Sequence, residues 1–172
     1  MKIQASLISE KISSNSKEAH DLFEQQRFGE KDGEKIFYLL SEAFYLFNEG
    51  RLEILDFKNK VLTEKEILQK FERIDKKILT KYFVFRDLRK KGYVVKSALK
   101  FGAEFRVYEK GDKVGESHSK WICFPVDENR GLTWHDFASK NRIAHSTKKN
   151  LLIAVVDEES AVSYFEVRWM RV

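Results

Sequence analysis

Three residue types in the second half of the chain could together carry out proton transfer at a phosphodiester. Tyr108 and His118 lie on either side of the stretch "EKGDKVGES", and the pair Lys148–Lys149 precedes the apolar run "NLLIAVV". A histidine titrates near neutral pH and can protonate a leaving group, while a tyrosine can transfer a proton when a nearby cation lowers its pKa. A lysine can stabilise the charge that develops at the phosphorus. These roles suffice for RNA transesterification, in which the ribose 2′-OH attacks its own phosphate without a metal.

The spacing of these residues leaves a second interpretation open, because tyrosine and histidine also pack together in proteins without catalytic function. A magnesium-dependent nuclease is a third interpretation. Such enzymes often carry Asp or Glu, any residue and then Lys on a strand, but Glu104 and Glu166 have no lysine two positions later. The remaining histidines and the single cysteine show no zinc-binding spacing: His20, His135, His145 and Cys123. Glycine-rich phosphate loops are missing too, so we predict neither a metal nor a cofactor.

The elements around these residues are predicted to be mostly strands. Apolar or alternating patterns predict five strands, within residues 93–99, 104–111, 120–126, 151–157 and 162–172. A helix capped by Thr133 is predicted over residues 134–146. Tyr108, His118 and Lys149 therefore fall at strand ends, where loops commonly present functional groups.

The first half of the chain has a mixed pattern. We predict a strand in residues 2–8, a short helix within 13–30, a helix over 34–50 and a strand over 51–57. Thr63 and Glu66 have the spacing of a capping box, which predicts a long helix that breaks near residues 75–80 and resumes until Gly92. The sequence thus predicts an α+β protein with a mixed domain at 1–92 and a second domain at 93–172, a mixed sheet flanked by helices that carries the candidate nuclease residues.

Composition limits the classes of partner and compartment. The net charge of +5 permits a polyanionic partner, although the cluster Arg89–Lys91 also suits the C-terminal dipole of a helix. Cys123 is expected to be a buried strand residue, and one cysteine cannot form an internal disulfide. The first residues lack the apolar core of a signal peptide, and no apolar run approaches the length of a membrane span. We therefore expect a cytoplasmic protein that does not act at a membrane.

Several motifs resemble the archaeal tRNA-splicing endonucleases. They are "YFVFRDLRKKGYVVKSALKFGAEFRVYEKG", then "ESHS", then "RIAHSTKKNLLIAVVD", with a fainter likeness in "LLSEAFYLFNEGRLEI". The resemblance implies excision of introns from precursor tRNA at a bulge–helix–bulge fold, leaving 2′,3′-cyclic phosphate and 5′-hydroxyl ends. It implies Tyr108 as general base, His118 as general acid and Lys149 as charge stabiliser, with Lys148 next to the phosphate.

The resemblance also implies how RNA is held and how subunits assemble. Family members clamp a bulge base between side chains of opposed subunits, and the matching positions are Arg142 and Tyr164, where some relatives have arginine. For Arg142 the alternative is a surface ion pair with Asp136 or a neighbouring residue. The family forms dimers or tetramers, sometimes with a non-identical structural subunit. This implies pairing through the C-terminal strand and docking of an acidic loop at Asp127–Glu128, which could instead be a solvated turn. A non-catalytic scaffold subunit is the remaining alternative.

Overall fold

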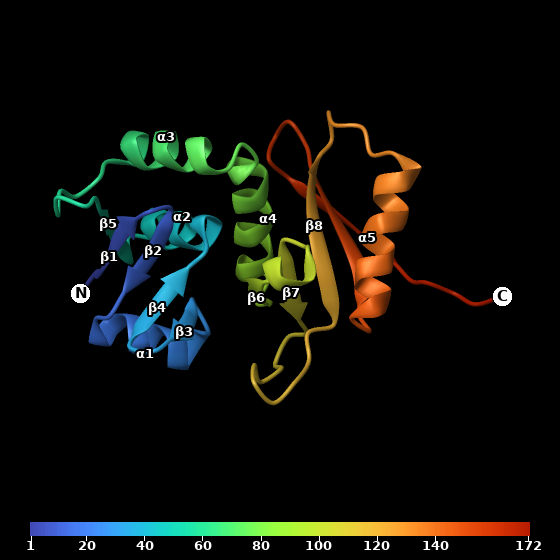
Figure 1. The fold of residues 1–172 in the computed structure, drawn as a ribbon, viewed down its shortest axis with the longest axis horizontal. Helices are drawn as coiled ribbons and strands as arrows, with labels where there is room; N and C mark the ends of the chain where they lie inside the picture. The colour runs from blue at the N-terminus through green and yellow to red at the C-terminus, as the bar shows by residue number, and fades with distance from the viewer. The chain divides into compact units, whose positions relative to one another are not determined.

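The structure is a computed structural model that describes residues 1–172, and the chain divides into two compact units (Figure 1). Unit 1 comprises Met1–Tyr82 and unit 2 comprises Phe83–Val172. The division falls inside helix α4 (Ile78–Lys90), so that most of this helix belongs to unit 2. None of the helices has the length and apolar character needed to cross a membrane.

Unit 1 is a five-stranded mixed sheet with three helices. The strand order is β3-β4-β2-β1-β5, in which only the β1–β5 pair is parallel. The elements of this unit are β1 (Ile3–Ile8), β2 (Lys11–Ser14), α1 (Lys17–Gln26), β3 (Glu30–Asp32), β4 (Lys35–Tyr38), α2 (Leu40–Asn48), β5 (Leu52–Leu55) and α3 (Glu64–Ile74).

The single helix predicted over residues 34–50 is wrong in its first part. Residues Lys35–Tyr38 form β4, in which buried Ile36 and Tyr38 alternate with less buried neighbours, and α2 begins only at Leu40. The break is fixed by Glu42, whose carboxylate accepts the backbone N–H of Gly29 at 2.7 Å and that of Leu39 at 3.3 Å. The apolar residues of β4 and α2 together have a spacing that resembles one long helix, because the short strand and the helix after it bury side chains in the same core.

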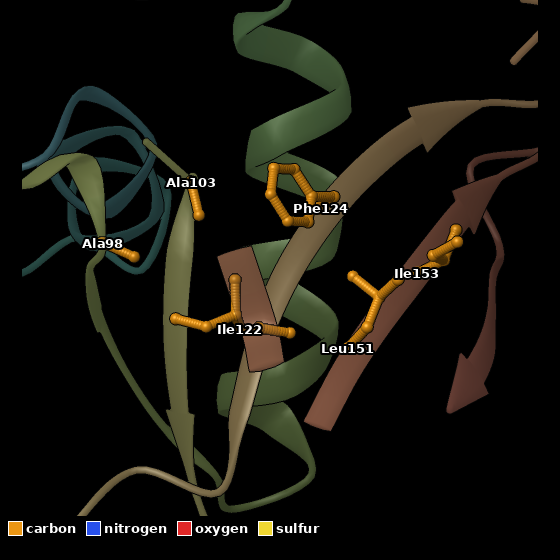
Figure 2. Close-up of a cluster of buried hydrophobic side chains, with 7 residues drawn as sticks. Ala98, Ala103, Ile122, Phe124, Leu151 and Ile153 are labelled. Carbon is orange, nitrogen blue, oxygen red and sulfur yellow. The ribbon is translucent and has the colours of Figure 1, made fainter. Parts of the chain in front are cut away.

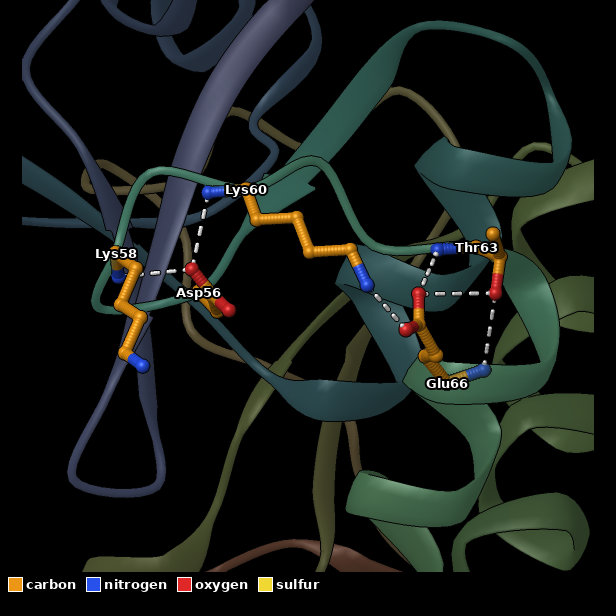
Figure 3. A network of polar contacts seen from close by, with 5 residues as sticks. All are labelled: Asp56, Lys58, Lys60, Thr63 and Glu66. Carbon is orange, nitrogen blue, oxygen red and sulfur yellow. Dashed lines mark hydrogen bonds and ion pairs between the residues drawn. The ribbon is translucent and has the colours of Figure 1, made fainter.

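The capping box predicted at the start of α3 is confirmed (Figure 3). The Glu66 carboxylate accepts the Thr63 backbone N–H at 2.9 Å, and Lys60 Nζ forms an ion pair with it at 2.6 Å. The hydrogen bond from the Lys60 ammonium is the largest cause that lowers the pKa of Glu66 to about 2, followed by hydrogen bonds from Thr63. The preceding turn is held by Asp56, which accepts the backbone N–H groups of Lys58 and Lys60 at 2.8 and 2.9 Å.

Replacing Thr63 by alanine is expected to destabilise unit 1 by about 1 kcal/mol, because the first N–H groups of α3 lose a side-chain acceptor. The substitution should leave RNA cleavage unchanged, since α3 carries none of the predicted site residues. The free energy of unfolding from urea titration tests this expectation. A Thr63→Ser variant retains the hydroxyl and should stay within about 0.5 kcal/mol of the wild type; equal losses in both variants would contradict the capping argument.

Unit 2 is built on a second five-stranded mixed sheet, with order β10-β9-β8-β7-β6. Strands β8 and β9 are parallel, and the other neighbours are antiparallel. The elements that follow α4 are β6 (Val94–Ser97), a 3₁₀ turn (Leu99–Phe101), β7 (Phe105–Tyr108), β8 (Trp121–Asp127), α5 (Trp134–Ser146), β9 (Asn150–Val156) and β10 (Val162–Val167). The five strands and the helix predicted for this part are all present.

The sheet of unit 2 lies between α4 and α5 (Figure 1). Successive side chains of each strand point to opposite faces of the sheet. On one face, Phe105 of β7 contacts Phe85 of α4, with ring centroids 6.0 Å apart. The opposite face forms the core beneath α5. This cluster consists of buried side chains from the sheet, from either side of the 3₁₀ turn and from α5, namely Ala98, Ala103, Ile122, Phe124, Ala144, Leu151 and Ile153 (Figure 2). The central strands are therefore buried on both faces, and they form a rigid support for the residues at their ends.

Candidate active site

The ends of three strands meet at one edge of the unit 2 sheet. Strand β7 ends at Tyr108, whereas β8 begins at Trp121 and β9 begins at Asn150. Because β7 and β8 are antiparallel while β8 and β9 are parallel, the end of the first strand lies beside the beginnings of the other two. Two backbone hydrogen bonds of 3.0 Å connect this edge, from the N–H of Lys120 to the carbonyl of Val107 and from the N–H of Asn150 to the carbonyl of Lys120.

Lys149 reaches this edge through the C-terminal cap of α5. Lys148 has a left-handed backbone conformation with φ 56°, and its N–H donates to the His145 carbonyl at 3.0 Å. The N–H of Lys149 donates to the Ala144 carbonyl at 2.9 Å, which completes a Schellman motif. The helix end thus fixes the backbone of Lys149 directly before β9.

The Lys149 side chain turns back toward the residue that follows His118. Its Nζ donates a hydrogen bond to the Ser119 carbonyl at 3.0 Å. Burial, followed by the charge of Arg106, lowers the pKa of the Lys149 ammonium. Arg106 lies two residues before Tyr108 on β7 and therefore on the same face of the sheet. The structure thus places Lys149 beside the segment that carries His118, at the edge where the strand of Tyr108 ends.

Tyr108 and His118 differ in exposure. Tyr108 is 5% exposed at the end of its strand, and His118 is exposed at the end of the loop that joins β7 to β8. The loop is closed at its base by an ion pair between Glu109 and Lys120. Within it, the N–H of Ser117 donates to the carbonyl of Lys113 at 2.8 Å. A buried residue and a solvent-facing residue thus approach the edge from opposite ends of one loop.

Arg142 and Lys148 lie near this edge without protein partners for their charges. Arg142 is exposed on α5 and forms no ion pair. The alternative predicted for it, an ion pair with Asp136 or a neighbouring residue, does not occur; the Asp136 carboxylate instead caps α5 by accepting from Thr133 at 2.6 and 3.2 Å. Lys148 lines a hollow of about 250 Å³ that begins beside Lys149. The other residues lining it are Asn141, His145, Lys149, Asn150, Arg168 and Trp169.

The structure does not bring Tyr164 to this group. Its hydroxyl donates to the Asp87 carboxylate of α4 at 2.7 Å, and the ammonium of Lys91 lies 5.1 Å from its ring centroid. Burial and the neighbouring Asp87 raise the pKa of Tyr164 well above its ordinary value. Tyr164 lies in the middle of the edge strand β10, where it pairs with Ala154, and is therefore away from the end of the sheet formed by the first residues of β9.

The aromatic residue that does lie beside the site is Trp169, which the sequence analysis did not single out. It is 51% exposed and stacks on His145 of α5, with ring centroids 4.3 Å apart. Trp169 lies two and four positions after Val167 and Phe165, so that alternation along the chain puts all three on the same face. Val167 packs against the core beneath α5. The alternation along the last strand therefore contained the signal that Trp169 faces α5 whereas Tyr164 faces α4.

Nowhere in the structure do three or more His, Cys, Asp or Glu side chains gather closely enough to hold a metal ion. Cys123 is fully buried in β8, as expected, and burial raises the pKa of its thiol beyond the ordinary range. What the edge offers instead is a phenol, an imidazole and an ammonium group on a fixed backbone. This set is suited to proton transfer and to the stabilisation of negative charge.

Comparison with known families agrees with this chemistry. The family model described as tRNA intron endonuclease, catalytic C-terminal domain, matches residues 78–164, and the one described as tRNA intron endonuclease, N-terminal domain, matches residues 3–68. The chain therefore belongs to the tRNA intron endonuclease family and is an enzyme of that class, and the candidate site lies within the part matched by the catalytic domain.

Individual relatives extend the match over most of the chain. The tRNA-splicing endonuclease of Thermococcus kodakarensis is 39% identical over 160 residues, which cover 93% of this chain and 93% of the relative. That of Thermococcus onnurineus is 38% identical over 160 residues, covering 93% and 91%. The tRNA-splicing endonuclease of Nanoarchaeum equitans is 41% identical over 138 residues, covering 77% and 88%.

Proposed function

We propose that this enzyme excises introns from precursor tRNA by metal-independent transesterification at bulge–helix–bulge sites, leaving 2′,3′-cyclic phosphate and 5′-hydroxyl ends. The observation that carries the proposal is the contact between Lys149 Nζ and the Ser119 carbonyl, which places a cation beside the residue next to His118. Its arrangement with Tyr108 at the adjoining strand end provides a base, an acid and a charge stabiliser around one phosphate.

Each residue has one role in the proposed reaction. Tyr108 accepts the proton of the ribose 2′-OH, and the resulting oxygen nucleophile attacks the adjacent phosphorus. His118 donates a proton to the departing 5′-oxygen as the bond from phosphorus to that oxygen breaks. Lys149 stabilises the additional negative charge on the non-bridging oxygens in the transition state. The proton lost by the 2′-OH and the one gained by the leaving group balance, so that no water or metal is consumed.

In this proposal, the surface next to Tyr108, His118 and Lys149 recognises the RNA bulge. Unpaired bases can be stacked on aromatic rings or on guanidinium planes, and exposed Arg142 and Trp169 offer one of each. Lys148 and Arg168 line the hollow beside Trp169, and both suit contact with phosphate. Tyr164, which was predicted as the second stacking position, would first have to release Asp87 before it could stack on a base.

Replacing Trp169 by alanine is expected to weaken RNA binding by about 10- to 100-fold, because one stacked base contributes about 1–3 kcal/mol. Stability should change little, since half of this side chain is exposed. The matched control is Tyr164→Phe, which removes the hydrogen bond to Asp87. It should lower the free energy of unfolding by about 1–2 kcal/mol and leave the binding constant unchanged. Fluorescence anisotropy and urea titration of both variants test the assignment, and the reverse pattern would restore Tyr164 as the stacking residue.

Assembly into a dimer or tetramer, with copies of itself or with a structural subunit, is part of the proposal. The last strand and the residues after it expose Phe165 at 57%, Met170 at 74% and Trp169 at 51%, which is a large apolar area for the end of a chain. The acidic loop at Asp127–Glu128 is a less distinctive feature. The Asp127 carboxylate accepts the backbone N–H of Asn129 at 2.9 Å within the loop, and the Glu128 carboxylate accepts that of Glu158, in the turn between β9 and β10, at 2.8 Å.

The proposed function is tested by cleavage of a bulge–helix–bulge RNA by the purified chain, alongside the same helix with both bulges fully paired. We expect cleavage in the bulges only. A single 2′-deoxy nucleotide at one bulge should abolish cleavage there and leave the other bulge as an internal control, because the nucleophile has been removed. Cleavage at the deoxy position would contradict transesterification, and cleavage of the paired helix would contradict recognition of the bulges.

A further inference from the structure

Ser119 combines three features that the roles assigned above do not explain. It directly follows His118, its carbonyl accepts the hydrogen bond from Lys149 Nζ at 3.0 Å, and it is only 5% exposed. Its hydroxyl is buried and has no hydrogen-bond partner. Buried hydroxyl groups without partners are unfavourable and rare in folded proteins, so that each one calls for an explanation.

The position of this hydroxyl makes a purely structural origin a poor explanation. The unpaired Ser119 hydroxyl directly follows His118, and the only other buried hydroxyl without a partner is that of Tyr38 in unit 1. Alanine would fill nearly the same space as serine without burying an unpaired polar group. Local departures from the most stable choice of residue are expected where function requires them.

The backbone around Ser119 is fixed on both sides of the edge. The next residue, Lys120, donates its N–H to the Val107 carbonyl and accepts from the N–H of Asn150, each at 3.0 Å. Ser119 therefore sits at the point where β7, β8 and β9 are joined. Any movement of its peptide would shift the side chain of His118 and the ammonium of Lys149 together.

We propose that Ser119 is a positioning residue that couples the proton donor to the charge stabiliser. Its carbonyl holds the Lys149 ammonium, its buried side chain fixes the peptide that carries His118, and its hydroxyl forms a hydrogen bond only when the RNA phosphate occupies the site. This inference rests on the proposed function and goes beyond it, because it assigns a role to a residue outside the three that perform the chemistry.

The test is the Ser119→Ala variant in single-turnover cleavage of the bulge–helix–bulge RNA. We expect the cleavage rate constant to fall about tenfold, as a small misplacement of catalytic groups does, while the affinity for RNA stays within about twofold. The melting temperature should be unchanged or raised by about 2–4 °C, since an unpaired buried group has been removed. Ser119→Cys, which keeps a weak donor, should restore part of the rate. Ser41→Ala, at a buried serine of unit 1, serves as the control and should leave the rate unchanged.

A double-mutant cycle separates positioning from a general structural effect. If Ser119 positions both Lys149 and His118, then Ser119→Ala should cause a smaller loss of rate in a Lys149→Met background than in the wild type. A wild-type rate in Ser119→Ala, a lowered melting temperature that accompanies the loss, or additive effects in the cycle would each overturn the inference. Wild-type protein and His118→Ala are measured alongside. Inactive wild-type protein would contradict the proposed function, whereas active wild-type protein with any of these three results would contradict the role of Ser119 alone.

Discussion

His118→Ala is expected to lower the cleavage rate constant by about 10²- to 10⁴-fold, the range that a positioned general acid contributes. The imidazole is exposed at the end of the loop from β7 to β8, so that its removal leaves no cavity in the core. RNA affinity should therefore remain within about threefold of the wild type, and the melting temperature should not change. Single-turnover cleavage and equilibrium binding of the same RNA measure the two quantities separately.

The control for His118 is a second exposed histidine of unit 2. His135 lies in the first turn of α5, at the start of the helix whose other end leads to Lys149, and His135→Ala should cleave at the wild-type rate. A His118→Ala variant that retained more than half of the wild-type rate would contradict its role as general acid. Equal losses in both variants would show instead that the loss does not depend on the position of the imidazole.

Lys149→Met is expected to lower the cleavage rate constant by about 10²- to 10³-fold, the usual effect of removing one group that stabilises charge in a transition state. Methionine keeps most of the length of the side chain but neither its charge nor its hydrogen bond to the Ser119 carbonyl. The companion variant Lys148→Met should mainly weaken RNA binding, because Lys148 lies in the adjoining hollow rather than on the Ser119 carbonyl. The two lysines of the pair can thus be assigned separately by rate constant and affinity.

The pKa of Lys149 gives this variant a second expected result. Burial and the charge of Arg106 lower the pKa, which means that the charged form is less favourable in the folded protein than in the unfolded chain. The resulting destabilisation is present at every pH below the folded pKa and is relieved as the pH rises through it. Lys149→Met removes the charge, so that stability at pH 7 should not fall even though activity does. A variant that lost activity and stability in parallel would indicate a structural role for Lys149.

Much of the site could be predicted from the sequence because its residues are placed by local patterns. The alternating and apolar runs gave the strands, and Thr133 gave the start of α5. These patterns put Tyr108 at the end of one strand and Lys149 directly before the start of another, and the two share an edge because both strands pair with β8. The contact between Lys149 and Ser119 could not be predicted from the sequence, because it depends on a side-chain direction set by the cap of α5.

The features that were missed depend on contacts between distant parts of the chain. Tyr164 and Asp87 are 77 positions apart, and nothing near Tyr164 in the sequence shows that α4 covers that face of the sheet. In unit 1, β2 and β3 are short strands of largely polar residues that exist through pairing with longer neighbours. The helix predicted over residues 34–50 failed for a similar reason, since the buried Glu42 carboxylate is needed to separate β4 from α2.

The central claim is that Tyr108, His118 and Lys149 carry out transesterification without a metal. The most direct test is the identity of the RNA ends that the purified chain produces from a bulge–helix–bulge RNA in excess EDTA, with candidate partner subunits added if the chain alone does not cleave. The account predicts undiminished cleavage with 2′,3′-cyclic phosphate and 5′-hydroxyl ends. Loss of cleavage in EDTA that is restored by magnesium, or ends carrying a 3′-hydroxyl and a 5′-phosphate, would contradict it.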